Sequence, residues 1–408
     1  MQDTPKGNRL HIAIFGRRNA GKSSLINRLT NQEIALVSNI PGTTTDPVYK
    51  TMEILPIGPV VIIDTAGIDD AGQLGALRIE RTMQVLNKAD LAVVVIDAGS
   101  GISEFDWEMI ELIRKKAIPA IVVMNKMDVA SIDEQILAGL SVEVKLPVLA
   151  ISAKTGSGME ELKRQIIKQA PENWDNIPVI GDLLNPGDTV VLVVPIDLAA
   201  PKGRLILPQV QTIRDILDHD SYCIVVKERE LREALSNMRS LPKMVVTDSQ
   251  EFLKVAADTP DEVLLTSFSI LFARHKGDLA TLVAGAKAID RLQPGDRVLI
   301  AEGCTHHRQA DDIGKVKIPR WLRQMVGGEL NFEWVSGGSF PTALTDYQLI
   351  VHCGACMLNR REMLYRLSEA REKRVPIVNY GILIAHVHGI LQRALKPFPL
   401  AQMIFEEG

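Results

Sequence analysis

The chain lacks several features that would place it in a specialised class of protein. No apolar run among its 408 residues approaches the roughly 18 that a membrane span needs, and Met1–Gly7 lacks the apolar core of a signal peptide. Only four residues are cysteine, and aromatic residues make up 4%. Neither charge sign dominates, because 46 Lys and Arg face 50 Asp and Glu, a net charge of −4. These absences argue against a membrane protein, a disulfide scaffold and a protein that coats nucleic acid, and they predict a cytoplasmic location.

The sequence has the composition of a folded protein, with 46% apolar and 24% charged residues, and its length allows several cores. Up to residue 170, short β-rich runs alternate with amphipathic stretches, which predicts an α/β domain with a mainly parallel sheet. The predicted strands are His11–Phe15, Val60–Asp64, Ala92–Asp97, Ile121–Asn125 and Val148–Ser152. We expect this first domain to span residues 8–170, followed by a proline-containing linker at 171–179.

Two smaller α/β domains are expected after the linker, at residues 180–264 and 265–408. Their predicted strands are Thr189–Val194, Tyr222–Val226 and Met244–Val246 in the first, and Arg297–Ala301, Tyr347–His352 and Val375–Asn379 in the second. Val210, Ile213 and Leu217 have helical spacing. The segments LNPGDTV at 184–190 and LQPGDRV at 292–298 are nearly the same, which indicates either a common turn type or a duplicated unit.

A glycine-rich loop follows the first predicted strand. Residues 16–23 read GRRNAGKS, which matches G-x-x-x-x-G-K-S, and a helix is predicted next at Ser24–Leu29. In this context backbone N–H groups surround phosphate oxygens, Lys22 reaches the β- and γ-phosphates, and the Ser23 hydroxyl binds Mg²⁺. The nucleotide contacts expected from this loop are Gly16, Asn19, Gly21, Lys22, Ser23 and Ser24.

Further motifs indicate a guanine nucleotide. Asp64-Thr65-Ala66-Gly67 ends a strand, where Asp64 can hold Mg²⁺ through water and the Gly67 amide can sense the γ-phosphate. The Asp128 carboxylate of Asn125-Lys126-Met127-Asp128 can accept two hydrogens from guanine, which selects GTP over ATP. Ser152-Ala153-Lys154 adds base contacts, and Thr44, within Pro41–Asp46, is the expected Mg²⁺ ligand of a switch.

Together these motifs resemble the GTPase superfamily, and the Gly-Thr-Thr run that begins at Gly42 resembles the tRNA-modification and ribosome-assembly GTPases. The resemblance implies an enzyme that converts GTP to GDP and phosphate, with Lys22, Asn19, Thr44 and Gly67 as candidate catalytic residues. Hydrolysis is expected to be slow, because Ile68 stands where signalling GTPases carry a water-orienting glutamine. Asn19 stands where similar GTPases bind K⁺, so K⁺ is expected to stimulate the reaction. The alternative is that Asn19 only satisfies loop backbone.

Cysteine and histidine cluster in the last predicted domain. Cys304-Thr305-His306 follows one strand and His352-Cys353-Gly354-Ala355-Cys356 follows another. If those strands are parallel neighbours, both groups lie at one end of a sheet. Three cysteines and a histidine suit structural zinc, whereas three cysteines on a four-iron cluster leave one iron for another ligand. Basic residues follow both groups: Arg308, Lys315, Lys317, Arg320 and Arg323, then Arg360, Arg361, Arg366, Arg371, Lys373 and Arg374.

The GTP motifs combined with C-x-H and H-C-x-x-C resemble the family of [FeFe]-hydrogenase maturation GTPases over nearly the whole chain. The resemblance implies a homodimeric scaffold that holds a di-iron precursor beside a [4Fe–4S] cluster. It implies apo-[FeFe]-hydrogenase as the acceptor and radical SAM maturation proteins as the builders of the precursor. It assigns Cys304, Cys353 and Cys356 to the cluster, with His306 or His352 near the fourth iron or the precursor, and basic residues neutralising an anionic precursor.

Two other interpretations remain open. The first is an RNA-modification or ribosome-assembly GTPase with a C-terminal zinc domain, but the acidic total and the scarcity of aromatic residues argue against nucleic acid as a partner. The second is a redox or iron-sensing switch in which a cluster regulates GTP turnover.

Overall fold

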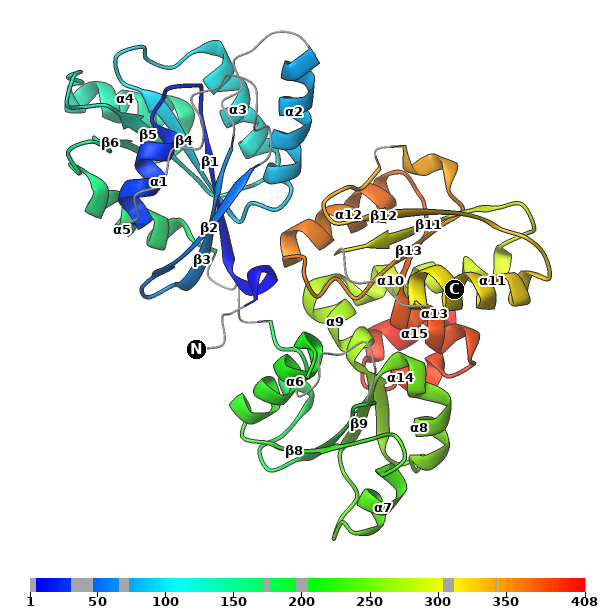
Figure 1. The fold of residues 1–408 in the computed structure, drawn as a ribbon. Coiled ribbons are helices and arrows are strands. Elements are labelled where there is room, and N and C mark those ends of the chain that lie inside the picture. The colour runs from blue at the N-terminus through cyan, green and yellow to red at the C-terminus, as the bar shows by residue number, and fades with distance from the viewer. Residues whose placement is uncertain are drawn as a thin grey trace. The chain divides into compact units, whose positions relative to one another are not determined.

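The computed structural model describes residues 5–30, 47–65, 73–171, 177–195, 205–303, 312–341 and 343–407, with side chains from residue 80 onward in the helix that begins at Gln73. The chain forms two compact units, Met1–Asn176 and Ile177–Gly408 (Figure 1). The predicted division of the second unit near residue 264 stays a prediction. Within the described ranges, no helix combines the length and the apolarity that crossing a membrane demands.

The first unit contains a sheet of six described strands in the order β2-β3-β1-β4-β5-β6. β2 runs antiparallel to β3, and the other neighbours are parallel. The strands are β1 (Leu10–Phe15), β2 (Val48–Ile54), β3 (Gly58–Asp64), β4 (Leu91–Asp97), β5 (Ala120–Asn125) and β6 (Val148–Ala150). This confirms the predicted mainly parallel sheet, although β6 ends two residues earlier than expected.

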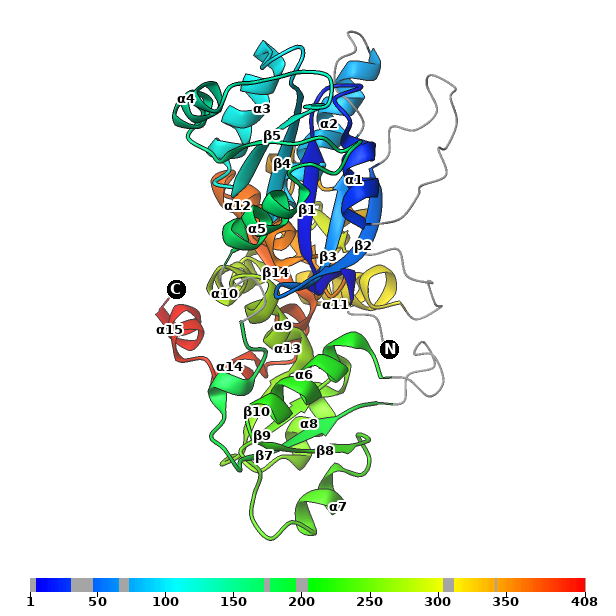
Figure 2. The same cartoon turned by 90° about the vertical axis from the view of Figure 1, so that its left-hand side faces the viewer.

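Helices cover both faces of this sheet, as the two views in Figures 1 and 2 show. Successive residues of β1 point to opposite faces, so Ile12 packs with α1 and α5 while Ala13 packs with α2 and α3. Burial on both faces explains why the central strands are continuous apolar runs. The helices are α1 (Lys22–Thr30), α2 (Gln73–Leu86), α3 (Glu104–Lys115), α4 (Glu134–Val144) and α5 (Met159–Gln169).

The second unit contains two parallel sheets of four described strands each, in the orders β10-β9-β7-β8 and β12-β11-β13-β14. β11 and β13 are parallel neighbours, as the sequence analysis required for one site at their ends. The first sheet has β7 (Thr189–Val193), β8 (Tyr222–Val226), β9 (Met244–Thr247) and β10 (Leu264–Ser267). The second has β11 (Arg297–Glu302), β12 (Asn331–Ser336), β13 (Leu349–His352) and β14 (Ile377–Asn379).

Helices connect these strands and close both ends of the unit. They are α6 (Leu207–Asp218), α7 (Leu231–Ser236), α8 (Phe252–Asp258), α9 (Phe268–Lys276), α10 (Leu279–Ala286), α11 (Ile318–Val326), α12 (Arg360–Glu372), α13 (Tyr380–Val387), α14 (Leu391–Leu395) and α15 (Pro399–Glu407). Single 3₁₀ turns lie at Gly181–Leu183, Ser249–Glu251, Ile289–Arg291 and Leu344–Asp346, with a short π-helix at Ile313–Lys317. One further 3₁₀ turn, Lys6–Asn8, lies in the first unit.

The two sheets of the second unit share one design. Numbered within each sheet, both have the strand order 2-1-3-4. Both begin at a Pro-Gly turn with a glycine at positive φ, 85° at Gly187 and 94° at Gly295. The aspartate that follows each glycine accepts the first N–H of the second strand, at 2.9 Å from Tyr222 and 2.8 Å from Asn331. These equivalent contacts favour the duplicated unit over a shared turn type.

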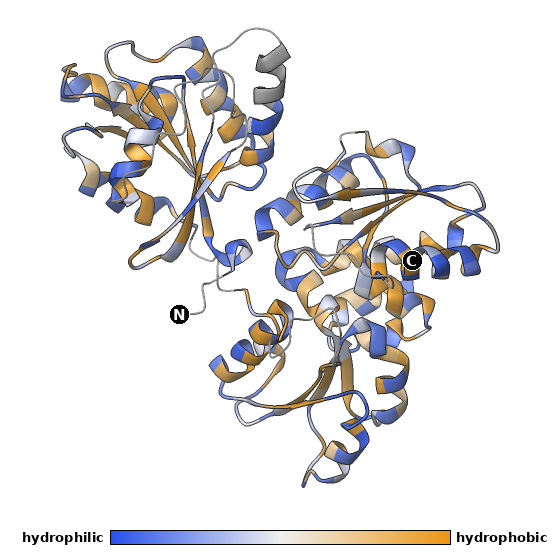
Figure 3. Ribbon diagram, in the orientation of Figure 1, coloured by the Kyte–Doolittle hydropathy of each residue, from blue (hydrophilic) through white to orange (hydrophobic). Residues whose placement is uncertain are grey.

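A single apolar core serves both sheets of the second unit. One cluster of buried side chains contains Val191 of the first sheet and Ile300 of the second, and it continues through α9 and α13. The strand ends meet there, because Asn379, the last residue of β14, donates to the Ser269 carbonyl in α9 at 2.9 Å. Figure 3 shows apolar residues along these strands and the helices that face them.

Three strands were not predicted, and each has a reason. β2 and β12 are the last described strands at one edge of their sheets and are half exposed, so their sequences mix polar and apolar residues. β10 is only four residues long. The predicted helix around Val210 forms, but Thr212 and Ile216 face the core, whereas Val210 and Leu217 are 39% and 54% exposed. Val210 and Leu217 therefore lie on the solvent-exposed side of the helix and not in the core.

Candidate functional site

The glycine-rich loop forms the expected turn between β1 and α1. Lys22 is 7% exposed, and its ammonium donates to the carbonyls of Gly16 and Arg17, both at 2.8 Å. Gly16 has φ of 144°, and a Cβ there would lie 2.2 Å from the Val95 carbonyl oxygen. The loop therefore needs glycine at this position and holds the lysine cation where phosphate oxygens can replace the carbonyls.

Ser23 and Asp64 meet beside this loop. The Ser23 hydroxyl donates to Asp64 Oδ2 at 3.1 Å, and Asp64 Oδ1 is buried with no donor among the residues that the structure describes. Burial raises the pKa of Asp64, and the Ser23 hydrogen bond and the Lys22 charge oppose that rise. A hydroxyl beside a carboxylate oxygen without a donor is the hard-oxygen environment that Mg²⁺ prefers. The residues fit the ion that the sequence implied.

The base-recognition motifs converge at the ends of β5 and β6. Asn125 bridges two loops, donating to the Ala20 carbonyl at 2.9 Å and accepting the Ala153 N–H at 3.0 Å. Asp128 accepts the Ser152 hydroxyl at 2.7 Å, and Lys154 lies 3.7 Å from its other oxygen. The Ser152 hydrogen bond lowers the pKa of Asp128, so its carboxylate is ionised near neutral pH. An ionised acceptor suits the two N–H groups of guanine.

The remaining residues predicted for the nucleotide site are Lys126, Asn19, Thr44 and Gly67. Lys126 pairs with Asp97 at the end of β4, with 2.7 Å between Nζ and Oδ2, a partner that no sequence motif indicated. Asn19 is exposed and has φ of 61°, a left-handed conformation that asparagine tolerates. Thr44 and Gly67 lie outside the described residues, so their predicted roles stay predictions.

The second predicted site lies at the carboxyl ends of β11 and β13. The Gly303 N–H donates to Cys353 Sγ at 3.0 Å, and the Ala355 N–H lies 3.5 Å from the same sulfur. Cys304 and His306 lie outside the described residues. Gly303, the last described residue before Cys304, therefore lies beside the Cys353 loop. Among the described side chains, no group of three or more His, Cys, Asp and Glu gathers as a metal site.

Charged and polar groups surround these cysteines. Burial raises the pKa of the Cys356 thiol, and the charge of Lys276, a side chain only 3% exposed, opposes that rise. The Tyr380 hydroxyl lies 3.3 Å from a carboxylate oxygen of the buried Glu302. Burial, followed by the nearby Cys353 and Glu302, raises the pKa of Tyr380 well above its usual value. Neither Glu302 nor Lys276 was predicted, because neither residue belongs to a motif with a recognisable spacing.

His352 is held by the protein on both sides of its ring. It is fully buried, its Nδ1 donates to the Cys353 carbonyl at 2.8 Å, and Arg366 lies 3.0 Å from its Nε2. Burial, and then the charge of Arg366, lowers the pKa of His352 to about 3. The imidazole is therefore neutral, and a role as an iron ligand would require the Arg366 contact to break.

Several basic residues that were expected to attract an anion are used inside the fold. Arg366 is 1% exposed and pairs with Glu362 at 3.0 Å. Arg360 donates to carbonyls at the end of α9, and Lys317 donates to Gln250 at 2.6 Å. The expected basic rim is wrong for Arg366, because its guanidinium is buried in an ion pair, and sequence alone cannot tell an inward basic side chain from an outward one. Arg360 and Lys317 are half-buried, and for them the expectation stays a prediction.

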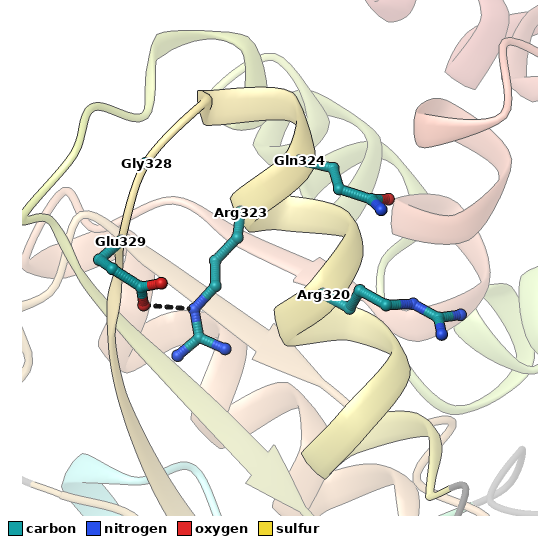
Figure 4. A pocket seen from close by; sticks show the side chains of 5 residues that line it. All are labelled: Arg320, Arg323, Gln324, Gly328 and Glu329. Atoms are coloured by element: carbon teal, nitrogen blue, oxygen red, sulfur yellow. Dashed lines mark ion pairs between the residues drawn. The ribbon is translucent and has the colours of Figure 1, made fainter.

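A surface pocket of about 380 Å³ lies along α11 and the segment that follows it. Its lining residues are Arg320, Arg323, Gln324, Gly328 and Glu329 (Figure 4). Arg323 points across the pocket to Glu329, with 2.8 Å between Nε and the carboxylate, which neutralises one of the two arginines. The pocket contains neither cysteine nor a glycine loop, so it is separate from both predicted sites.

Comparison with protein families assigns each part of the chain. The hydrogen maturase F (HydF) dimerization domain matches residues 179–277, and the HydF tetramerization domain matches residues 280–397. These two matches together cover more than half of the chain. It belongs to the HydF family. A third family, described as 50S ribosome-binding GTPase, matches residues 11–126, and the sequence-based recognition of a hydrogenase maturation GTPase is thereby confirmed.

Curated GTPases are similar to this HydF-family chain over about two fifths of its length. A tRNA modification GTPase MnmE from Desulfotalea psychrophila is 42% identical over 172 residues, which cover 41% of this chain and 36% of the relative. A GTPase Der from Sulfurihydrogenibium sp. is 36% identical over 180 residues, covering 41% and 40%. The chain thus spans less than half the length of these relatives. The solved G domain of the T. maritima FeoB iron transporter has 28% identity and a TM-score of 0.32, covering 40% of this chain and 99% of that one.

The family assignment agrees with the first site described above. The HydF-family chain has an N-terminal GTPase domain whose ligands are GTP or GDP and Mg²⁺, followed by further α/β domains. Its matches to a dimerization and a tetramerization domain support oligomerization.

Proposed function

We propose that this chain is a GTP-hydrolysing scaffold that holds a [4Fe–4S] cluster and a di-iron precursor, and that it delivers the precursor to apo-[FeFe]-hydrogenase. The observation that carries the proposal is the C-x-x-C loop at the carboxyl end of β13, next to the residue that precedes Cys304, in a chain of the HydF family. Radical SAM maturation proteins are the proposed source of the precursor.

The described residues fit a cluster ligated by Cys304, Cys353 and Cys356. Backbone N–H groups already point at Cys353 Sγ, and hydrogen bonds of this kind stabilise cluster thiolates. The buried ammonium of Lys276 supplies positive charge near Cys356. With three cysteine ligands, the cluster would offer one iron to a further ligand. His306 is a candidate for that position. His352 holds the cysteine loop through the Cys353 carbonyl, and it could ligate the iron only if its contact with Arg366 broke.

A metal and sulfide count tests the cluster. Anaerobically prepared full-length wild type is compared with Cys353→Ser and with Cys223→Ser, a half-buried cysteine on β8 that serves as the matched control. We expect about four irons and four sulfides per chain in wild type and in the control, and loss of both in Cys353→Ser, with EPR of the reduced protein as the second readout. One zinc and no reducible cluster would reject the scaffold and support an RNA-linked GTPase.

GTP hydrolysis is proposed to be slow and to depend on K⁺ bound near Asn19. The proposal rests on the exposed, left-handed Asn19 in the phosphate loop and on the polar groups that gather at Ser23 and Asp64. Turnover in KCl is compared with turnover in NaCl for wild type and Asn19→Ala. The K⁺ effect should disappear in the variant, and an equal rate in both salts for wild type would contradict it.

Lys22→Ala should lose both GTP turnover and hydrogenase maturation, and intact maturation would separate the two activities.

The proposed homodimer forms through an apolar surface on α6 and β8. β8 is paired only with β7 among the described strands, and the N–H groups of Tyr222, Ile224 and Val226 face β7 or its preceding turn. Cys223 and Val225 therefore direct their backbone groups to the open side, as in any paired strand. The exposed apolar side chains of α6, the two residues before it and β8 are Leu205, Ile206, Val210, Leu217, Tyr222, Ile224 and Val225, with Ile224 and Val225 on opposite faces of the sheet.

An open apolar edge is a ready template for pairing with a second copy, and residues 179–277 match a dimerization domain. Val225→Arg should shift full-length protein to a smaller assembly in light scattering coupled to gel filtration. Val142→Arg is the matched control, because Val142 is 78% exposed on α4 of the GTPase unit. If the assembly is unchanged in Val225→Arg, or is lost equally in the control, the dimer uses another surface.

A further inference from the structure

Arg17, the second residue of the phosphate loop at 16–23, is anchored to the segment that follows β4. Its Nη2 donates to the Ser100 hydroxyl at 2.8 Å and to the Gly101 carbonyl at 3.0 Å. Its Nε lies 3.2 Å from Asp106 Oδ2 in the first turn of α3. The side chain of Arg17 is 26% exposed and that of Asp106 is 1% exposed, so the ion pair is largely removed from water. One guanidinium therefore joins the phosphate loop to the segment between β4 and α3.

Asp106 depends on this cation. Its Oδ2 also accepts the Ser103 N–H at 2.9 Å and the Ser103 hydroxyl at 2.7 Å, as part of the capping box that begins α3. Its other oxygen, Oδ1, is buried and has no hydrogen-bond donor among the described residues. A buried carboxylate is destabilising unless a cation pairs with it. The start of α3 therefore holds Arg17 in place, and α3 itself packs on the sheet through Met109 and Ile110.

The segment after β4 also contacts the base-recognition motif. Lys126 of that motif donates to Asp97 Oδ2 at 2.7 Å, and the Gly99 N–H donates to Asp97 Oδ1 at 3.0 Å. The Lys126 hydrogen bond lowers the pKa of Asp97, burial opposes this, and the charge of Arg17 adds to the lowering. The Ser100 hydroxyl, which accepts from Arg17, donates to the Asp97 carbonyl at 3.2 Å. The contacts thus run from Arg17 through Ser100 and Asp97 to Lys126.

The phosphate loop has little regular structure of its own to fix it. Gly16, Asn19 and Gly21 all have positive φ, and the helix begins only at Lys22. Contacts with the surrounding structure have to maintain such a turn. Lys22 donates to the Arg17 carbonyl at 2.8 Å, so the main chain of Arg17 contacts the phosphate-binding lysine while its side chain is anchored outside the loop.

We propose that Arg17 positions the phosphate loop for the nucleotide, and that residues 97–106 link the phosphate side of the site to its base side. The inference rests on the GTP hydrolysis proposed above and adds a residue that the phosphate-binding motif leaves unspecified. The contacts of the Arg17 guanidinium given above are to protein atoms, which makes Arg17 a positioning residue. Its loss should weaken GDP and GTP alike and raise KM, while kcat at saturating GTP stays near that of wild type.

Calorimetry of GDP binding to the full-length chain with Mg²⁺ tests this positioning. Arg17→Gln should weaken GDP about tenfold or more, because a small displacement of binding groups has a large effect. Arg17→Lys should recover part of the affinity, since it keeps a cation beside Asp106 but lacks the planar fork of donors. Arg114→Gln is the matched control and should bind like wild type, because Arg114 pairs with Glu111 at the other end of α3.

Ser100→Ala tests the link between the two sides of the site. It removes the hydroxyl between Arg17 and Asp97 and leaves the Asp106 ion pair intact. GDP should bind more weakly than to wild type, and the double variant Arg17→Gln with Ser100→Ala should bind like Arg17→Gln alone. Fully additive losses would overturn the link through Ser100.

Wild-type affinity for GDP in Arg17→Gln would overturn the proposal, and so would an equal loss in Arg114→Gln. A fall in kcat with unchanged KM would also overturn it, because that result marks a contact made only in the transition state. If Arg17→Gln fails to fold, Arg17→Lys decides, with weaker GDP binding supporting the proposal and wild-type binding rejecting it. Absence of GTP turnover in wild type would reject the proposed hydrolysis, whereas the GDP affinities would still decide the role of Arg17.

Discussion

Replacing Arg366 with methionine removes the centre of a buried polar network. The guanidinium is 1% exposed and contacts His352 Nε2 at 3.0 Å, the Gly337 carbonyl at 2.6 Å and Glu362 at 3.0 Å. Methionine fills similar volume beside Phe340 but leaves the Glu362 carboxylate, only 10% exposed, without its cation. Loss of one partner of a buried ion pair costs about 3–5 kcal/mol, and the orphaned carbonyl and imidazole keep the expected loss near the upper part of that range.

The free energy of unfolding has to be measured for the second unit alone, because the chain has two compact units and multidomain proteins depart from two-state unfolding. Hydrogen exchange by mass spectrometry, followed in peptides from β13 and α12 across a urea series, provides this. Arg371→Met on the exposed side of α12 is the control and should change stability by less than about 0.5 kcal/mol. The double variant Arg366→Met with Glu362→Met should recover part of the loss, since it removes the stranded charge. A loss below about 1 kcal/mol in Arg366→Met would refute the buried-pair reasoning.

Three further predictions follow from single contacts. Burial lowers the pKa of His275 from 6.5 to about 4. The unfolded chain therefore takes up the proton first as pH falls, and the free energy of unfolding decreases below pH 6.5. Between pH 7 and 5, urea unfolding of the second unit should show wild type losing about 2 kcal/mol more than His275→Gln. Asp128→Asn should weaken GDP binding about tenfold or more in calorimetry, because an amide cannot accept both guanine N–H groups, and unchanged affinity would remove Asp128 from base recognition. Gly16→Ala should abolish nucleotide binding, because its Cβ would lie 2.2 Å from the Val95 carbonyl oxygen, and normal binding would show that the loop can move away.

The GTPase half was largely predictable because its motifs sit at fixed places in a parallel sheet. Central strands such as β4 and β5 are apolar on both faces, so continuous apolar runs located them to within a residue. The residues that end those strands then had to converge at one edge, and Asn125 and Asp128 do so. Asp97 escaped prediction because a single aspartate after a strand has no spacing that marks it as the partner of Lys126.

The cysteine half was predictable in position but not in detail. The motif located Cys353 beside the end of β11, since parallel neighbours end at the same edge. The surroundings depend on long-range packing that spacing does not encode. Arg366 and Arg371 lie five residues apart on α12, yet one is buried against His352 and the other faces solvent. A helix rotated by part of a turn would exchange their roles.

The common core of the second unit implies that the borders of the two HydF family matches are not borders of folding. A chain cut between residues 277 and 280 would strip Arg360 from the end of α9 and expose the faces of α9 and α13 that pack on each other. Arg393 repeats the arrangement, because it reaches from α14 to the carbonyls of Ala256 and Thr259 in the other half. Each half therefore buries part of its apolar surface against the other half. The fused pair behaves as an intramolecular dimer, fixed in one chain at a one-to-one ratio.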